Sequence, residues 1–222
     1  MTDTLKRPEA GALIDENFSE TIHGVTVSDA YRAFEKFTSS DVLSWVDANN
    51  EYVEDFVAGA SDAARLKDVL QKAFDYPRSS MMVKYGNRYF WSYNSGLQPQ
   101  SVQCYKDGKD GETKVFYDPN EEDKDGRISV QDVTISPNGK YAAIQTMVDG
   151  KDSSIIRIYD IDADDFLVET LDHCRYSSVV WLPDESGFVY DQYFITEEGE
   201  KNTSGRKPYV HKLNTAQGHD KA

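Results

Sequence analysis

The sequence has no apolar run of the roughly 18 residues or more that a helix needs to cross a bilayer. Its first twenty residues are polar and acidic, and they contain no apolar signal-peptide core. We therefore expect a cytoplasmic protein with no membrane partner.

Positive charge is also scarce. Lys and Arg together number 24, against 39 Asp and Glu, which gives a net charge of −15. Such a chain is repelled by nucleic acid phosphates and by anionic lipid, so we expect neither as a partner. The acidic residues are spread along the chain, which is typical of a solvated surface and not of an acidic tail.

Cysteines are few, and the motifs of metal and cofactor sites are missing. Cys104 and Cys174 have no C-x-x-C spacing, and we expect two reduced thiols, one in each of two strands, although a disulfide stays open. The sequence contains no H-E-x-x-H motif and no glycine-rich phosphate loop. The acidic run at residues 121–126 lacks the alternating ligands of a calcium loop. We expect no cofactor and no metal.

The G-x-S-x-G turn that carries the nucleophile of many serine hydrolases is absent. A catalytic triad also needs a histidine base beside such a serine. His23, His173, His211 and His219 have no identifiable nucleophile near them in the sequence, so we expect structural roles for all four. The chain is predicted to hold no catalytic residue.

Two zones of different pattern occupy the first third of the chain. Residues 1–39 are irregular, and we expect an extended segment there. Residues 40–75 carry apolar side chains at three- and four-residue spacing in two runs, which break at Gly59. This pattern predicts a helical hairpin that begins at a cap formed by Ser40 or Asp41.

From residue 81 onward, β-branched and aromatic residues alternate with turn residues, which predicts short strands. Gly86, Gly139 and Gly187 each lie in a strand–turn–strand unit, and the unit recurs at an interval of about 50 residues. Four short strands per unit are typical of a β-propeller blade, and a β-sandwich is the alternative. The expected strands are 81–85, 89–93, 102–105 and 114–117 in the first set, 130–135, 141–147, 155–159 and 168–171 in the second, and 178–181, 188–193 and 209–213 in the third.

The third set lacks its last strand, and a polar, turn-like tail follows Leu213. A propeller closes only with about four or more blades, whereas these sets supply about two and a half. The sequence therefore predicts a mainly β chain with an amino-terminal α-helical hairpin and an incomplete β-propeller.

The first set and the residues just before it contain one long run of motifs: Tyr76-Pro77, Gly86-Asn87-Arg88-Tyr89-Phe90 and Tyr93-Asn94-Ser95-Gly96-Leu97-Gln98-Pro99-Gln100. This run resembles the prolyl oligopeptidases, a family of serine peptidases, which show a Y-P pair, then a G-x-R-Y-F hairpin, then Y-N-(S/T)-G-L-Q-x-Q. Near the amino terminus, Ala30 and Ala33 stand where the family usually has proline and tryptophan, so the resemblance is to a divergent member.

The resemblance implies an α/β-hydrolase domain with a Ser-Asp-His triad, which cleaves short peptides after proline. A seven-bladed propeller caps this domain and restricts substrate size. Residues 1–75 would then belong to the hydrolase domain, and residues 76–222 would form the first blades. The rest of the hydrolase domain, on the carboxyl-terminal side, would be missing, so we expect this portion to be inactive alone.

Tyr176 resembles a family aromatic residue that contributes, from the propeller side, to the pocket beyond the proline subsite. Aromatic faces suit that task because proline-rich peptides present flat apolar rings. The alternative for Tyr176 is a tyrosine of the propeller core. Two alternatives for the whole chain also stay open: a stand-alone or oligomeric interaction module, and a truncated fragment without function.

Overall fold

The computed structural model describes residues 6–195 and 201–222, and it divides into two compact units. The first unit ends at Ala73 and the second begins at Phe74. Within the described residues, no helix is long and apolar enough to cross a membrane. Most of the regular structure is β-sheet, as the sequence predicts.

A β-hairpin forms where the sequence pattern indicated only an extended segment. Strand β1 (Ser19–Ile22) pairs antiparallel with β2 (Val25–Ser28). His23 and Gly24 join them with φ values of +51° and +82°, as in the two-residue turns that match strand twist. The expectation of an irregular segment is therefore wrong for these strands. Two short 3-10 helices flank the hairpin, η1 (Gly11–Leu13) and η2 (Arg32–Glu35).

Two helices follow, α1 (Ser40–Ala58) and α2 (Ala63–Phe74). The residue before α1 is Ser39, and its side chain makes no capping hydrogen bond, so the predicted cap at Ser40 or Asp41 is wrong. Gly59 ends α1 as expected, and its N–H donates to the carbonyl of Asp55 at 2.9 Å.

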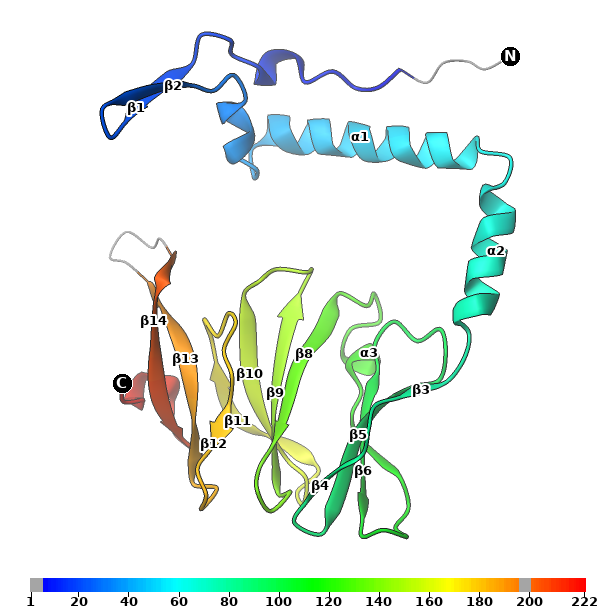
Figure 1. Ribbon diagram of the computed structural model, residues 1–222, viewed down its shortest axis with the longest axis vertical. Coiled ribbons are helices and arrows are strands. Elements are labelled where there is room, and N and C mark those ends of the chain that lie inside the picture. The colour runs from blue at the N-terminus through cyan, green and yellow to red at the C-terminus, as the bar shows by residue number, and fades with distance from the viewer. Residues whose placement is uncertain (1–5, 196–200) are drawn as a thin grey trace. The chain divides into compact units, whose positions relative to one another are not determined.

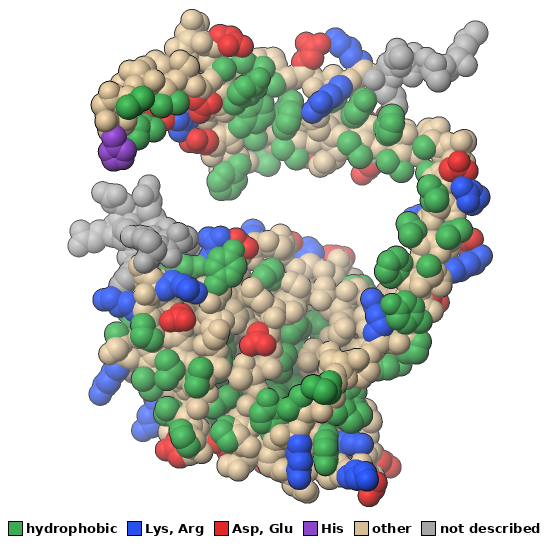
Figure 2. All heavy atoms as spheres, viewed as in Figure 1, with side chains coloured by type: hydrophobic (Ala, Val, Ile, Leu, Met, Phe, Trp, Pro, Cys, Tyr) green, Lys and Arg blue, Asp and Glu red, His purple; other side chains and the backbone are tan. Residues whose placement is uncertain are grey.

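The two helices do not lie side by side, so they form no packed hairpin (Figure 1). Their apolar side chains are largely exposed within this unit, as the green spheres along both helices show (Figure 2). Only Val42 of α1 is buried, and no residue of α2 is. The exposed apolar residues of the two helices include Val53, Phe56, Val57, Leu66, Val69, Leu70 and Phe74.

The second unit consists of three antiparallel sheets that stand next to one another in chain order (Figure 1). Within each sheet, strands that follow one another in the chain pair with one another, as in propeller blades. Short β3 (Arg78–Ser79) and β4 (Val83–Tyr85) both pair with the edge of β5 that lies opposite β6. This arrangement confirms the predicted incomplete propeller. The remaining strands are β5 (Arg88–Asn94), β6 (Val102–Asp107) and β7 (Lys114–Tyr117) in the first blade, β8 (Ile128–Ile135), β9 (Tyr141–Val148), β10 (Ser154–Asp160) and β11 (Asp165–Leu171) in the second, and β12 (Val180–Trp181), β13 (Gly187–Ile195) and β14 (Lys201–Lys212) in the third.

Among the described residues, the third blade has three strands, and the tail continues beyond them. After β14 the chain turns back through a 3-10 helix, η3 (Gln217–His219). Lys221 then pairs antiparallel with Val210 as a single bridge. The tail expected to be only turn-like thus lies along β14, in the position of a fourth strand.

The core lies between the blades, because alternate side chains of a strand face opposite neighbours. On β9, Ala142 and Ile144 pack with the first blade, whereas Ala143 packs with the third. Aromatic residues fill the first interface, where the rings of Phe116 and Tyr159 are 5.7 Å apart. Each large side chain buried in this way stabilises the fold by about 1.5–3 kcal/mol.

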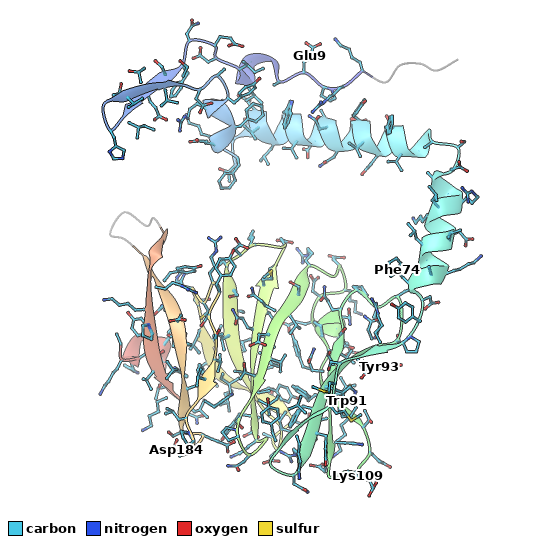
Figure 3. The ribbon with its side chains drawn as sticks, in the orientation of Figure 1. Glu9, Phe74, Trp91, Tyr93, Lys109 and Asp184 are labelled. Atoms are coloured by element: carbon cyan, nitrogen blue, oxygen red, sulfur yellow. The ribbon has the colours of Figure 1, made fainter. Side chains whose placement is uncertain are left out.

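A smaller cluster lies on the other face of the first blade. Trp91 of β5 packs there with Val102 and Cys104 of β6, and all three are buried. Trp91 and Tyr93, two residues apart on β5, are labelled in Figure 3. No further blade within the described chain covers this face.

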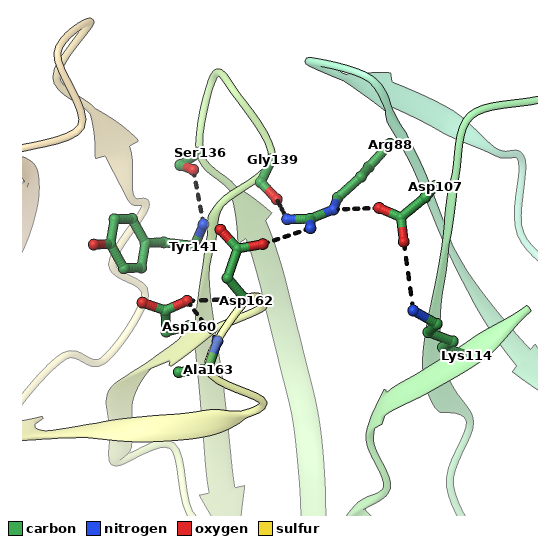
Figure 4. Close-up of polar contacts among 9 residues, drawn as sticks. All are labelled: Arg88, Asp107, Lys114, Ser136, Gly139, Tyr141, Asp160, Asp162 and Ala163. Carbon is green, nitrogen blue, oxygen red and sulfur yellow. Dashed lines mark hydrogen bonds and ion pairs between the residues drawn. The ribbon is translucent and has the colours of Figure 1, made fainter. Parts of the chain in front are cut away.

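Arg88 joins the first two blades (Figure 4). Its guanidinium donates to Asp107 at 2.8 Å in its own blade, to the carbonyl of Gly139 at 3.0 Å and to Asp162 at 2.5 Å in the second. These three acceptors surround the planar guanidinium group and fix its orientation. A short helix, α3 (Pro119–Glu122), adds a second link, because Glu122 accepts from Arg157 of β10 at 2.7 Å.

Candidate functional site

Tyr176 lies in the loop between β11 and β12, not in the propeller core. Its φ is +52°, an uncommon value for a residue with a side chain, and the residue is 56% exposed. Such a backbone persists only when its surroundings hold it. The contacts of its ring and its backbone therefore decide where the exposed aromatic face points.

Three residues hold Tyr176. Its hydroxyl donates to Asp152 at 3.1 Å, and the guanidinium of Arg175 lies 4.8 Å from its ring centre. Arg175 also forms an ion pair with Asp152, so the Asp152 carboxylate, the Arg175 guanidinium and the Tyr176 phenol form one cluster. Arg206 donates to the carbonyl of Tyr176 at 2.8 Å. The ring is thereby fixed at its tip and at its backbone, with one face open to solvent.

The topology brings these residues to one end of the sheets. Asp152 lies in the turn from β9 to β10, Tyr176 lies in the connection from β11 to β12, and Arg206 is on β14. In an antiparallel sheet, every second connection lies at the same end. Tyr176 was predicted from the sequence, whereas Asp152 and Arg206 were not.

Two further polar groups adjoin the cluster. Tyr193 of β13 is 6% exposed, burial raises the pKa of its phenol, and its hydroxyl has no hydrogen-bond partner among the described residues. The N–H of Tyr193 donates to the carbonyl of His173 at 3.2 Å. The hydrogen bond with the Tyr176 side chain raises the pKa of the Arg175 guanidinium. The cluster is suited to binding a ligand through an aromatic face and guanidinium groups.

The histidines are spread over both units. His23 lies in the turn of the amino-terminal hairpin, His173 in the loop after β11, His211 on β14 and His219 in η3. In the part of the chain that the structure describes, no histidine side chain is hydrogen-bonded to a serine, and no group of three metal-binding side chains gathers.

The two cysteines are free and buried. Cys104 lies on β6 as expected, but the prediction that Cys174 lies in a strand is wrong. Cys174 follows β11 in the loop, after His173, whose positive φ of +59° takes the chain out of the extended conformation. Burial raises the thiol pKa of both cysteines.

The three blades, each with its strands paired in chain order, define the second unit as part of a β-propeller. A family model described as the prolyl oligopeptidase N-terminal beta-propeller domain matches residues 13–222. The chain belongs to the prolyl oligopeptidase family.

Curated relatives agree with this assignment. The chain is 34% identical to a prolyl endopeptidase of Elizabethkingia meningoseptica over 99% of its own length and 31% of the relative. It is 29% identical to prolyl oligopeptidase A of Amanita bisporigera over 93% of its length and 31% of that protein. The chain thus spans about a third of the length of these relatives.

Solved structures show the same fold. A prolyl endopeptidase structure superposes with a TM-score of 0.87 at 24% identity, over 97% of this chain and 32% of the other. Prolyl oligopeptidase B of Galerina marginata, bound to a 35mer substrate, gives a TM-score of 0.73 at 26% identity, over 88% of this chain and 30% of the other.

Proposed function

We propose that this chain is the propeller portion of a serine endopeptidase that hydrolyses short peptides after proline. The observation that carries the proposal is the family match over residues 13–222, on a chain whose blades form an open arc. The catalytic serine, acid and base would be supplied by an α/β-hydrolase domain outside these residues. The propeller would cap that domain and admit only small substrates.

The exposed helices support the assignment of the two parts of the chain to different domains. We propose that residues 1–75 pack against the hydrolase domain and that residues 76–222 form the cap. Helices α1 and α2 carry large apolar side chains that remain exposed, including Phe56 at 62% and Leu70 at 54%. Exposed apolar patches of this kind mark surfaces that bind another protein surface.

Tyr176 is the proposed substrate contact. Its ring is exposed yet held by Asp152 and Arg206, so it offers a flat apolar face at little cost in conformational entropy. The partner is a short peptide that contains proline, because proline rings stack on such faces. Two buried, unpaired thiols support a cytoplasmic location.

The experiment begins with the reading frame that follows Ala222. We expect it to encode further blades and a G-x-S-x-G turn, and we expect the longer protein to cleave a Gly-Pro reporter. Tyr176→Ala should raise KM several-fold with kcat nearly unchanged. Tyr176→Phe, which keeps the ring and the backbone contact with Arg206 but loses the hydrogen bond to Asp152, should raise KM much less. A long reading frame without a nucleophile turn would defeat the peptidase proposal. Equal KM values for Tyr176→Ala and the native enzyme would defeat only the role of Tyr176.

A further inference from the structure

The first and third blades each have one sheet face without a neighbouring blade among the described residues. Successive side chains of a strand point to opposite faces of its sheet, so the packed residues identify the free face. On β5, Phe90 packs toward the second blade, and Trp91 lies on the opposite face. On β13, Phe188 packs toward the second blade, and Val189 lies on the opposite face. We call these two surfaces the first-blade face and the third-blade face.

The first-blade face has an aromatic centre and an open apolar margin. Trp91 pairs with Cys104, and Cys104 pairs with Val115, so the three residues form a row across β5, β6 and β7. Trp91 and Cys104 are buried, whereas Val115 is 52% exposed. Tyr93, two residues beyond Trp91 on β5, is 37% exposed (Figure 3). The face therefore presents rings and a β-branched side chain that no other blade covers.

The third-blade face is a row of valines. Val180 pairs with Val189, and Val189 pairs with Val210, so the row crosses β12, β13 and β14. Val180 is 62% exposed and Val210 is 44% exposed. The face is apolar like the first-blade face, but it carries only small aliphatic side chains in this row.

The interface between the second and third blades shows which kinds of face fit together. There, the rings of Phe188 and Tyr190 pack with the smaller Ala143 of β9. Rings on one blade against small aliphatic side chains on the next fill the space between two sheets. The two free faces divide in the same way, with Trp91 on one and valines on the other. Contact between two first-blade faces would set rings against rings, and contact between two third-blade faces would contribute no ring.

We propose that two copies of this chain form a dimer, in which the first-blade face of each copy packs on the third-blade face of the other. Three blades from each copy make a ring of six, which lies within the range of about four to eight blades in known propellers. A twofold axis relates the two contacts, so association closes at the dimer and does not continue into a filament. The proposal does not depend on peptidase activity. In the longer protein proposed above, further blades would cover both faces and this dimer would not form.

The first test is the mass of the purified 222-residue chain, measured by sedimentation equilibrium at micromolar concentration. Salt at about 0.3 M screens the repulsion between two copies that each carry a net charge of −15. We expect a species with twice the 25.1 kDa mass of one chain. A monomer, or larger species that keep growing with concentration, would overturn the proposal.

The second test places a carboxylate on each face in turn, as Val180→Asp and Val115→Asp. Both side chains are exposed in the single chain, so circular dichroism should show the native sheet content in both variants. Each substitution buries an unpaired charge in both contacts of the dimer, and it should weaken association at least about 100-fold. Val168→Asp is the matched control, because Val168 is 94% exposed on β11 of the second blade and lies outside both faces. The control should remain a dimer.

The two variants also identify any other mode of association. A dimer that resists Val180→Asp but is lost in Val115→Asp would mean that two first-blade faces pair with each other. A dimer that resists both substitutions would place the contact on another surface, such as the exposed apolar side chains of α1 and α2. Either result would contradict the six-bladed ring.

Discussion

Gly86 and Asn138 approach each other backbone to backbone, and a Cβ atom placed on Gly86 would lie 2.2 Å from the carbonyl oxygen of Asn138. The two residues belong to the first hairpin turns of neighbouring blades. The approach is reciprocal, since a Cβ on Gly139 would lie 2.8 Å from the carbonyl of Tyr85. Gly86 and Gly139, two of the three glycines that mark the repeat in the sequence, therefore lie where the first two blades meet. Gly187 differs, because a Cβ atom on it would meet His211 of its own blade.

Gly86→Ala should destabilise the chain strongly, because it adds a clash with rigid backbone to an unfavourable φ of +56°. Gly150→Ala is the matched control, with φ +64° and no atom within 4 Å of the new Cβ. The control should lower the free energy of unfolding by about 1–2 kcal/mol, which is the strain of a left-handed residue alone. Urea denaturation should show a clearly larger loss for Gly86→Ala. Equal losses would mean that the turns do not dock.

Arg88→Met should lower the free energy of unfolding by about 2 kcal/mol, because the variant keeps an apolar stem but loses the charged hydrogen bonds that join the blades. A double-mutant cycle with Asp162→Asn isolates one of these bonds. We expect a coupling energy of about 1 kcal/mol, since Asp162 is half exposed. Additive losses would show that the ion pair contributes nothing.

Asp107 should contribute stability that is lost in acid. The hydrogen bond from Arg88 lowers the pKa of its carboxyl. A group with a depressed folded pKa stabilises the fold above its ordinary value of about 4, and the contribution disappears as the pH falls through the folded pKa. Asp107→Asn should therefore be less stable than the native chain at pH 7 and equal to it near pH 2. A loss of stability for Asp107→Asn that persists unchanged at pH 2 would contradict this contribution.

Both thiols should resist modification in the native chain. The thiolate is the reactive species, and burial raises the pKa values of Cys104 and Cys174. In the native chain, reaction of the thiols with a disulfide reagent at pH 8 should be at least about 100-fold slower than in denaturant, where both thiols should react. The variants Cys104→Ser and Cys174→Ser show which thiol gives each phase of the labelling time course. Rapid native labelling of Cys174 would contradict the packing of the loop after β11.

The strands of the blades could be predicted from the sequence because each alternates between two cores, as Ala142, Ala143 and Ile144 do. The amino-terminal hairpin could not be found in this way, since Val25 and Val27 are exposed and no buried face imposes a period. The His23-Gly24 pair was the available signal, as a two-residue turn with positive φ.

The candidate site was predictable only at Tyr176. Asp152 and Arg206 meet it across separations of 24 and 30 residues. Such contacts depend on the way two loops and strand β14 meet at one end of the sheets, and no local pattern encodes them. For the same reason, the sequence could not show that His211 lies between Glu169 and Asp220, which come from β11 and the tail.

The location of the catalytic residues is tested most directly by measuring the peptidase activity of the 222-residue chain itself. We propose that the catalytic serine, acid and base lie in the part of an α/β-hydrolase domain outside these residues. The purified chain should therefore release no chromophore from a Gly-Pro reporter above the buffer background. Turnover that a serine-directed reagent abolishes would contradict this placement, because it would require a nucleophile within residues 1–222.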